Sequence, residues 1–186
     1  MTQIVLKVFS PMHSMKGSVY QLSVKPRTEN ERGLPKQEVS TAYLRAEGLE
    51  GDYNTYRNSL LFQGNRMNRA VLMYPYEMLE QLQSEGWPVA PGHLGENITS
   101  CGIPYDAFVL GQQYRIGPDA IIEVAEVCSP CRWLHVLPYV GKKNQKEFIA
   151  TLINRRGWYA RVIREGMLQK GDEIQPLTRL LNHNKT

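Results

Sequence analysis

The segment 112-QQYRIGPDAIIEVAEVCSPC-131 decides the fold class of this chain. It contains two alternating or apolar runs, 112–117 and 120–127, with Gly117 and Pro118 at the break between them. A period of two is typical of a half-buried β-strand, because successive side chains point to opposite faces of the sheet. The pattern therefore predicts two consecutive strands, the second of which runs directly into a Cys-x-x-Cys sequence.

Runs of the same kind continue outward in both directions and are separated by Gly, Pro and Asn. They predict five further strands, at 3–9, 19–25, 37–44, 70–74 and 172–177. Between two of these runs, the polar segment 26–36 is expected to be a surface loop. Many short strands without regular helix alternation predict a mostly β fold, a closed or partly open β-barrel with a few helical insertions.

Two segments have helical patterns. The first is 75–86, where Pro75 suits the first turn and Gly86 ends the helix. The second is 144–157, which begins with Asn144 as N-cap and has a glutamate at the capping-box position. The residues expected to be buried on these helices are Met78, Leu79, Leu82, Phe148, Ile149, Leu152 and Ile153.

Length and composition restrict the class of protein. A chain of 186 residues, 42% hydrophobic and 22% charged, is expected to fold as one soluble domain over 1–186. No apolar run suits a signal peptide or a membrane span, so we expect a cytoplasmic protein with no membrane contact. The formal charge of +4 is spread along the chain without RNA-binding aromatic motifs. This predicts no nucleic-acid partner and fits an anionic small-molecule cofactor.

The three cysteines are compatible with several kinds of site, namely a disulfide framework, a zinc site and a thioredoxin-like redox site. Three cysteines are an odd and small number, so a secreted disulfide framework is not expected. A structural zinc site needs four ligands, and only one Cys pair with scattered Cys101, His93 and His135 is offered. A thioredoxin-like site fits the strand before the pair, but not the β-rich region that precedes it.

The individual thiols also differ in their sequence context. Cys101 is expected to be a buried residue that packs like a small hydrophobe. Around Cys131, the turn-forming Ser129 and Pro130 and the following Arg132 predict a strand-end loop with a cation nearby, which favours the thiolate. Cys131 is therefore the predicted reactive thiol.

Seven short segments occur in an order that composition does not explain. They are 48-GLEGD-52, 69-RAV-71, 92-GHLGENI-98, 111-GQQYRIG-117, 129-SPC-131, 157-GWYARV-162 and 166-GMLQKGD-172. In this order they resemble the MOSC domain, which is named for the C-terminal domain of molybdenum cofactor sulfurases and also occurs in stand-alone bacterial proteins. The resemblance covers 48–172 and implies a closed β-barrel-like fold, in agreement with the strand pattern.

The resemblance also implies a site. Cys131 matches the cysteine of the family, as a nucleophile or as a ligand to molybdenum. Candidate residues for holding the cofactor are Asp52, Arg69, Glu96, Asn97, Arg132 and Arg161, because they offer charges and an amide to a polar heterocycle and its phosphate. From the residues alone, Asp52 in a hairpin turn, Asn97 capping its own turn and a solvated Arg161 are open alternatives.

The chain departs from the family pattern at two places. The cysteine motif is usually written Arg-x-Pro-Cys, but here Cys128 occupies the arginine position. Cys128 is either a second catalytic thiol, able to attack a persulfide on Cys131, or a replacement that simply removes one anion-binding cation. Within 62–71, relatives often carry a His-His-Gly-Gly run, whereas this chain has no histidine there.

Two functions of different classes are implied. In the first, Cys131 accepts sulfane sulfur from a pyridoxal-phosphate-dependent cysteine desulfurase and carries it as a persulfide. In the second, Cys131 ligates molybdenum, and the bound cofactor reduces N-hydroxylated compounds with electrons from a partner protein. We expect a sulfur carrier or molybdenum-cofactor-binding protein first, such a reductase second, and an unrelated CxxC thiol oxidoreductase third.

Overall fold

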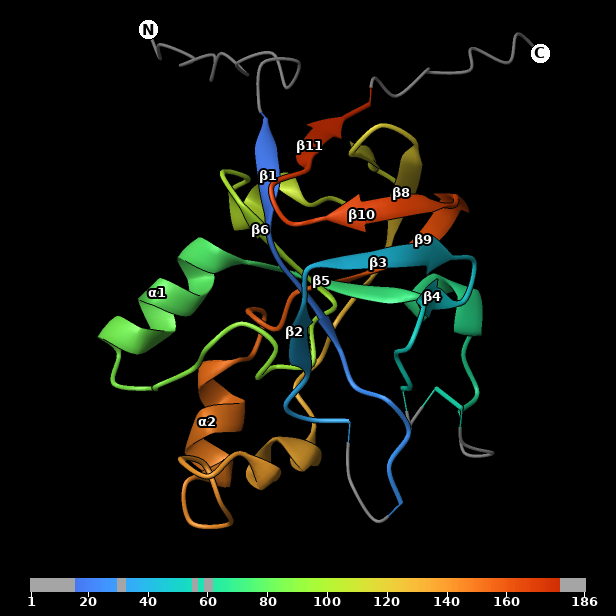
Figure 1. Cartoon of the computed structure of the whole chain (residues 1–186). Helices are drawn as coiled ribbons and strands as arrows, with labels where there is room; N and C mark the ends of the chain where they lie inside the picture. The colour runs from blue at the N-terminus through green and yellow to red at the C-terminus, as the bar shows by residue number, and fades with distance from the viewer. Residues whose placement is uncertain (1–15, 30–32, 55–56, 59–61, 178–186) are drawn as a thin grey trace, which may run out of the picture.

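The computed structural model describes residues 16–29, 33–54, 57–58 and 62–177. Its main sheet contains β1 (Gly17–Val24), β2 (Gln37–Val39), β5 (Val71–Pro75), β6 (Ile98–Cys101), β7 (Gln113–Ile116), β8 (Ala120–Val127), β9 (Trp158–Arg164) and β11 (Glu173–Pro176). The order of its eight strands is β11-β7-β8-β9-β5-β6-β1-β2, and β1 also pairs with β11. All of them except β2 therefore form a closed barrel, which confirms the predicted fold class (Figure 1).

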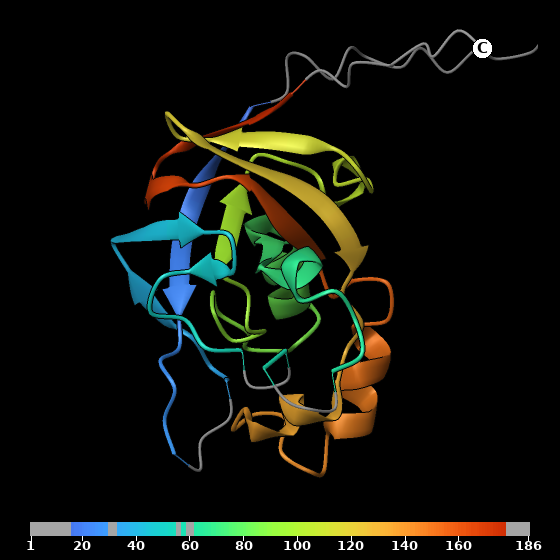
Figure 2. The same ribbon diagram turned by 90° about the vertical axis from the view of Figure 1, so that its right-hand side faces the viewer.

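The remaining elements lie around this barrel. A second sheet joins β3 (Thr41–Arg45), β4 (Gly48–Leu49) and β10 (Gly166–Gln169). The helices are α1 (Tyr76–Ser84) and α2 (Gln145–Thr151), with short 3-10 helices η2 (Arg66–Arg69), η3 (Tyr105–Ala107) and η4 (Arg132–Val136). In both ribbon views α2 and η4 lie together beneath one end of the barrel (Figures 1 and 2). None of the helices in the described part is long and apolar enough to cross a membrane.

Two separate clusters of apolar side chains hold these elements together. The first fills the barrel, and β8 shows its origin, because Ala120, Ile122 and Val124 are buried while the residues between them are less so. The second cluster lies under the helices, where Leu79 of α1, Leu134 of η4 and Phe148 of α2 belong to one group of buried residues. The helical end of the molecule thus has its own core.

Three strand ends meet where the two clusters adjoin. Val127, the last residue of β8, pairs with Trp158, the first residue of β9. Met73 of β5 pairs both with Trp158 and with Ile98, the first residue of β6. Residues that directly follow β8 or directly precede β9 and β6 are therefore brought close together.

The predicted second helix is too long. It ends at Thr151, and Asn154 has a positive φ of 60°, a left-handed conformation that does not continue a helix. Ile153, expected to be buried, is 57% exposed for this reason. Asn144 is the N-cap residue, as predicted, but its side chain makes no capping hydrogen bond, because its amide donates to the carbonyl of Tyr139.

The predicted strands need three adjustments. The segment 37–44 divides into β2 and β3, which belong to different sheets. The strands β4, β6, β9 and β10 were not predicted, and the strand expected at 3–9 lies outside the described residues. The expected surface loop 26–36 ends in Lys36, which is buried.

Candidate functional site

The backbone fixes the two-cysteine segment to the start of β9. The amide of Cys128 donates a 2.9 Å hydrogen bond to the carbonyl of Gly157. Gly157 has φ +90°, and a Cβ there would lie 2.4 Å from the carbonyl oxygen of Met73, so only glycine fits. In this arrangement Cys128 is buried and Cys131 is exposed. The thiol expected to react is therefore the accessible one.

Arg156, just before Gly157, is the most unusual residue of this region. Its side chain is buried, and Nη2 donates to the carbonyl of Leu94. Nε and Nη1 have no hydrogen-bond partner in the described part of the chain. Burial lowers the pKa of Arg156. The nearby acidic side chains outweigh this effect and raise the pKa above its usual value; they are Cys128, Tyr159, Cys131 and Glu96. A buried, charged guanidinium thus lies near both thiols and has hydrogen-bond donors without a partner among the described residues.

Glu96 is the acidic counterpart of Arg156 and is fully buried. Its Oε1 accepts a 2.7 Å hydrogen bond from the amide of Gly92, while Oε2 has no partner among the described residues. Burial raises the pKa of Glu96, although two backbone hydrogen bonds and the charges of Arg156 and Lys36 oppose the shift. Gly92 is again required, because a Cβ there would lie 2.5 Å from the carbonyl oxygen of Lys36.

Two tyrosines and Arg69 surround the thiol side of this region. Tyr105 accepts a 3.1 Å hydrogen bond from the amide of Gly157. Burial raises the pKa of Tyr159, and the neighbouring Cys128 adds to the shift. Arg69 lies 5.2 Å from the centre of the Tyr159 ring and pairs through Nε with Glu126 at 2.7 Å. Arg69 is therefore close to the thiols, but it already has a carboxylate partner.

Asp52 and Asn97 belong to a buried polar network. Asp52 pairs with Lys36 at 2.7 Å, and both side chains are nearly inaccessible. Asn97 donates to Asp52 and to the carbonyl of Ser23, and it accepts from the amide of Leu72. Every polar group of the Asn97 amide is thus satisfied within the protein. The contacts of both residues tie β1, β5 and β6 together.

The other candidates lie outside the buried region around Arg156. Arg161 is exposed on β9 and pairs with Glu123 at 2.7 Å. Arg132 is exposed, and its guanidinium lies 4.7 Å from the centre of the Trp133 ring. Cys101, expected in the core, is only partly buried, and burial together with Glu77 raises the pKa of its thiol.

Sequence reasoning missed Arg156. The available signal was the pair of arginines in 155-RRG-157, directly before the segment 157-GWYARV-162. The local pattern does not reveal burial, however, because the hydrogen-bond partner of Arg156 among the described residues is Leu94, 62 positions away. The candidate site is therefore made of Cys128, Cys131, Glu96 and Arg156, with Tyr105, Tyr159 and Arg69 around them.

The chemistry of this set fits an anionic, hydrogen-bonding ligand with a soft metal. An unpaired buried guanidinium costs several kcal/mol, and an anion that binds it offsets this cost. The free Oε2 of Glu96 and the exposed thiol of Cys131 add an acceptor and a soft ligand atom. No group of three or more His, Cys, Asp or Glu that could hold a metal exists among the described residues. A metal bound to Cys131 would therefore have to bring most of its other ligands with it.

Comparison with known proteins shows where such a chain belongs. The uncharacterized protein YflK of Bacillus subtilis (strain 168) is 27% identical over 155 residues, which cover 80% of this chain and 65% of YflK. A protein of Gibberella moniliformis named "Reductase" is 33% identical over 88 residues, 47% of this chain and 15% of that protein. The chain thus spans less than two thirds of these relatives.

Structural comparison agrees with the fold described above. The crystal structure of the YuaD protein from Bacillus subtilis superposes with a TM-score of 0.73 at 19% identity and covers 87% of this chain and 96% of that one. Residues 50–175 match the family model of the MOSC domain, close to the 48–172 expected from the motifs. The chain belongs to the MOSC domain family.

Proposed function

We propose that this chain binds the molybdenum cofactor, with Cys131 as the thiolate ligand of the metal and Arg156 as the cation that holds an anionic group of the cofactor. MOSC domains bind molybdenum cofactor or act in sulfur transfer. The observation that carries the proposal is the buried guanidinium of Arg156, whose Nε and Nη1 have no partner within the described residues. A sulfur carrier would also gain from a cation that favours its thiolate, but sulfur transfer alone would leave Nε and Nη1 of Arg156 without a hydrogen-bond partner.

Each residue of the site has a defined task in this proposal. Arg156 donates charge-assisted hydrogen bonds and is kept in place by the carbonyl of Leu94. Glu96 accepts a hydrogen bond at Oε2, or donates one when protonated, which its raised pKa favours. Tyr105 and Tyr159 border the site as aromatic walls. When bound, the cofactor supplies the redox chemistry of its metal.

Metal content is the direct test. Protein purified gently from cells that make the cofactor is analysed for molybdenum and, after oxidation, for fluorescent pterin. Cys131→Ser and Arg156→Met are expected to lose most of both, while the matched control Arg161→Met keeps them, since Arg161 is exposed and paired with Glu123. Wild-type protein without metal or pterin, or equal loss in the two arginine variants, would sink the proposal.

Sulfur transfer is a second candidate, favoured by the exposure of Cys131. In this reaction the Cys131 thiolate attacks the outer sulfur of a persulfide on a cysteine desulfurase, forms a new S–S bond and releases the desulfurase thiolate. Incubation with such a desulfurase and cysteine should label wild type and Cys101→Ser but not Cys131→Ser. Equal labelling of the two variants would exclude Cys131 as the carrier.

A reductase role is the extension of the cofactor proposal. The relative named "Reductase" matches over only 15% of its length, so its name supports this role without defining a substrate. We propose reduction of N-hydroxylated compounds with electrons from a separate donor protein. Adding an electron-donor protein to metal-loaded chain and measuring loss of the N-hydroxyl group tests it, with Cys131→Ser as the inactive control.

A further inference from the structure

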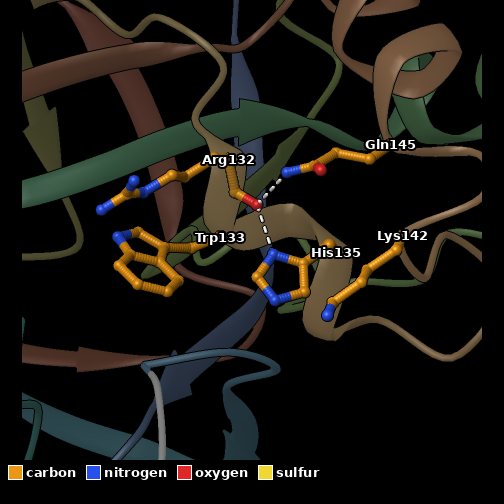
Figure 3. Close-up of a pocket in the computed structure, with 5 residues that line it drawn as sticks. All are labelled: Arg132, Trp133, His135, Lys142 and Gln145. Atoms are coloured by element: carbon orange, nitrogen blue, oxygen red, sulfur yellow. Dashed lines mark hydrogen bonds between the residues drawn. The ribbon is translucent and has the colours of Figure 1, made fainter.

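A shallow pocket of about 410 Å³ is formed mainly by residues that follow Cys131 in the chain. Its lining residues are Arg132, Trp133, His135, Lys142 and Gln145, and all five are drawn in Figure 3. The first three belong to η4, whose N-cap is Cys131, and Gln145 is the first residue of α2. The pocket and the exposed thiol are therefore neighbours along one short segment.

Hydrogen bonds fix the two sides of the pocket to each other. The carbonyl of Arg132 accepts from Nδ1 of His135 and from Nε2 of Gln145, both at 2.6 Å. Figure 3 shows the His135 ring and the Gln145 amide pointing to this one oxygen. Because η4 and the start of α2 share an acceptor, the pocket is held in shape before any ligand binds, which reduces the cost of binding.

The lining is basic and has no acidic member. Arg132 and Lys142 supply positive charges, and neither makes an ion pair with any residue that the structure describes. His135 lies beside Lys142 in Figure 3 and adds a ring nitrogen. By contrast, the exposed Arg161 on β9 has a carboxylate partner in Glu123. This pocket keeps its cations available for an anion.

The pocket also has an aromatic wall. The indole of Trp133 is half-buried and lines the pocket, with the Arg132 guanidinium 4.7 Å from its centre and the His135 ring 5.9 Å away. Planar groups stack on indole and guanidinium surfaces. A cation pair beside such a wall suits a flat ring that carries a negative charge better than a bare inorganic ion.

We infer that this pocket binds a small planar organic anion, an aromatic ring bearing a phosphate or a carboxylate, next to the Cys131 thiol. Binding itself does not require the cofactor. That the bound molecule is the substrate handled at Cys131 rests on the proposed function. The position of the pocket supports this role, since Cys131 is the N-cap of η4 and directly precedes the lining residue Arg132.

Titration calorimetry of cofactor-free protein tests the binding. The probe is phenyl phosphate, with benzoate as the carboxylate form, phenol as the ring without charge and inorganic phosphate as the charge without ring. Phenyl phosphate should bind at least about tenfold more tightly than phenol or inorganic phosphate. Arg132→Gln and Lys142→Gln should each weaken it about three- to tenfold, and added salt should weaken it further.

Lys170→Gln is the matched control, because Lys170 is an exposed lysine paired with Glu38 outside the pocket. Its affinity for phenyl phosphate should equal that of wild type. Equal weakening by Lys170→Gln, equal affinity for phenyl phosphate and inorganic phosphate, or no binding up to about 10 mM would overturn the inference. Arg156→Met separates the two proposals, because loss of metal with intact phenyl phosphate binding supports the pocket independently of the cofactor. Wild-type protein that holds metal but does not bind phenyl phosphate would overturn the pocket inference and leave the cofactor proposal standing.

Discussion

Glu96 and Arg156 are buried within reach of each other's charge, yet they form no ion pair. The same short loop holds both, because Glu96 accepts from the amide of Gly92 and Arg156 donates to the carbonyl of Leu94. Each keeps polar atoms without a partner in the part of the chain that the structure describes. Opposite charges that are fixed apart in this way suit a ligand that offers an acceptor to one and a donor to the other.

Arg156→Met should not destabilise the cofactor-free protein. Removing a buried charge with two unsatisfied nitrogens is expected to leave the free energy of unfolding unchanged or raise it by up to about 2 kcal/mol. Urea unfolding measures this. Arg57→Met is the control, because Arg57 is also buried but donates to the carbonyls of Arg69 and Ala70, and its loss should cost about 2–4 kcal/mol. Equal destabilisation of the two variants would make Arg156 an ordinary structural arginine.

Glu96→Gln should change how stability depends on pH. The folded-state pKa of Glu96 is raised above 4.5, mainly by burial, so the folded protein holds this proton more tightly than the unfolded chain. Its contribution is fully present below pH 4.5 and is lost as the pH rises through the folded pKa. Urea unfolding of both proteins from low to neutral pH should show wild type losing stability relative to Glu96→Gln. Parallel pH curves would contradict the shift.

Asp52→Asn should act on stability and not on the cofactor. It leaves Lys36, whose pKa burial already lowers, without its carboxylate in a nearly inaccessible place. The expected loss is about 3–5 kcal/mol, and the double variant with Lys36→Met should recover much of it. Molybdenum per folded molecule should stay constant. A stable Asp52→Asn protein that no longer holds metal would instead return Asp52 to the binding site.

Cys128→Ala should lengthen the lifetime of a persulfide on Cys131. If Cys128 resolves the persulfide, its sulfur attacks the inner sulfur of Cys131, forms a disulfide and releases hydrosulfide. Alanine is the suitable change, since Cys128 is buried beside Arg156 and an arginine there would bring a second cation into that space. Mass spectrometry of the Cys131 peptide over time measures the decay, with Cys101→Ala as control. Identical decay in all three proteins would leave Cys128 a packing residue.

The sequence predicted those parts of the molecule that local periodicity determines. The strand at 120–127 matches β8 from its first to its last residue, because buried and less buried side chains alternate from Ala120 to Ala125. The short strands β6 and β10 escaped prediction, since their four residues each become strands through pairing with β1, β5 or β3. Pairing with strands far away in the chain produces no recognisable sequence pattern in so short a segment.

The same distinction applies to the site. Cys131 lies between the end of β8 and the start of η4, in agreement with the strand-end loop predicted from the Ser-Pro turn before it. The buried state of Arg156 depends on the loop that carries Leu94, far away in the chain, so the sequence gives no local sign of it. Of the cations predicted from motifs, Arg161 and Arg69 already pair with glutamates, and a motif does not reveal such a partner on another strand.

The presence of two apolar clusters affects how the molecule opens. The barrel cluster and the cluster beneath α1 and α2 are separate, so the helical end can open transiently while the barrel stays closed. Arg156 reaches from the start of β9 to the carbonyl of Leu94, a residue of the helical cluster. A ligand held by Arg156 would therefore couple the two halves, and a protein that opens in two stages when empty would open in a single cooperative transition when filled.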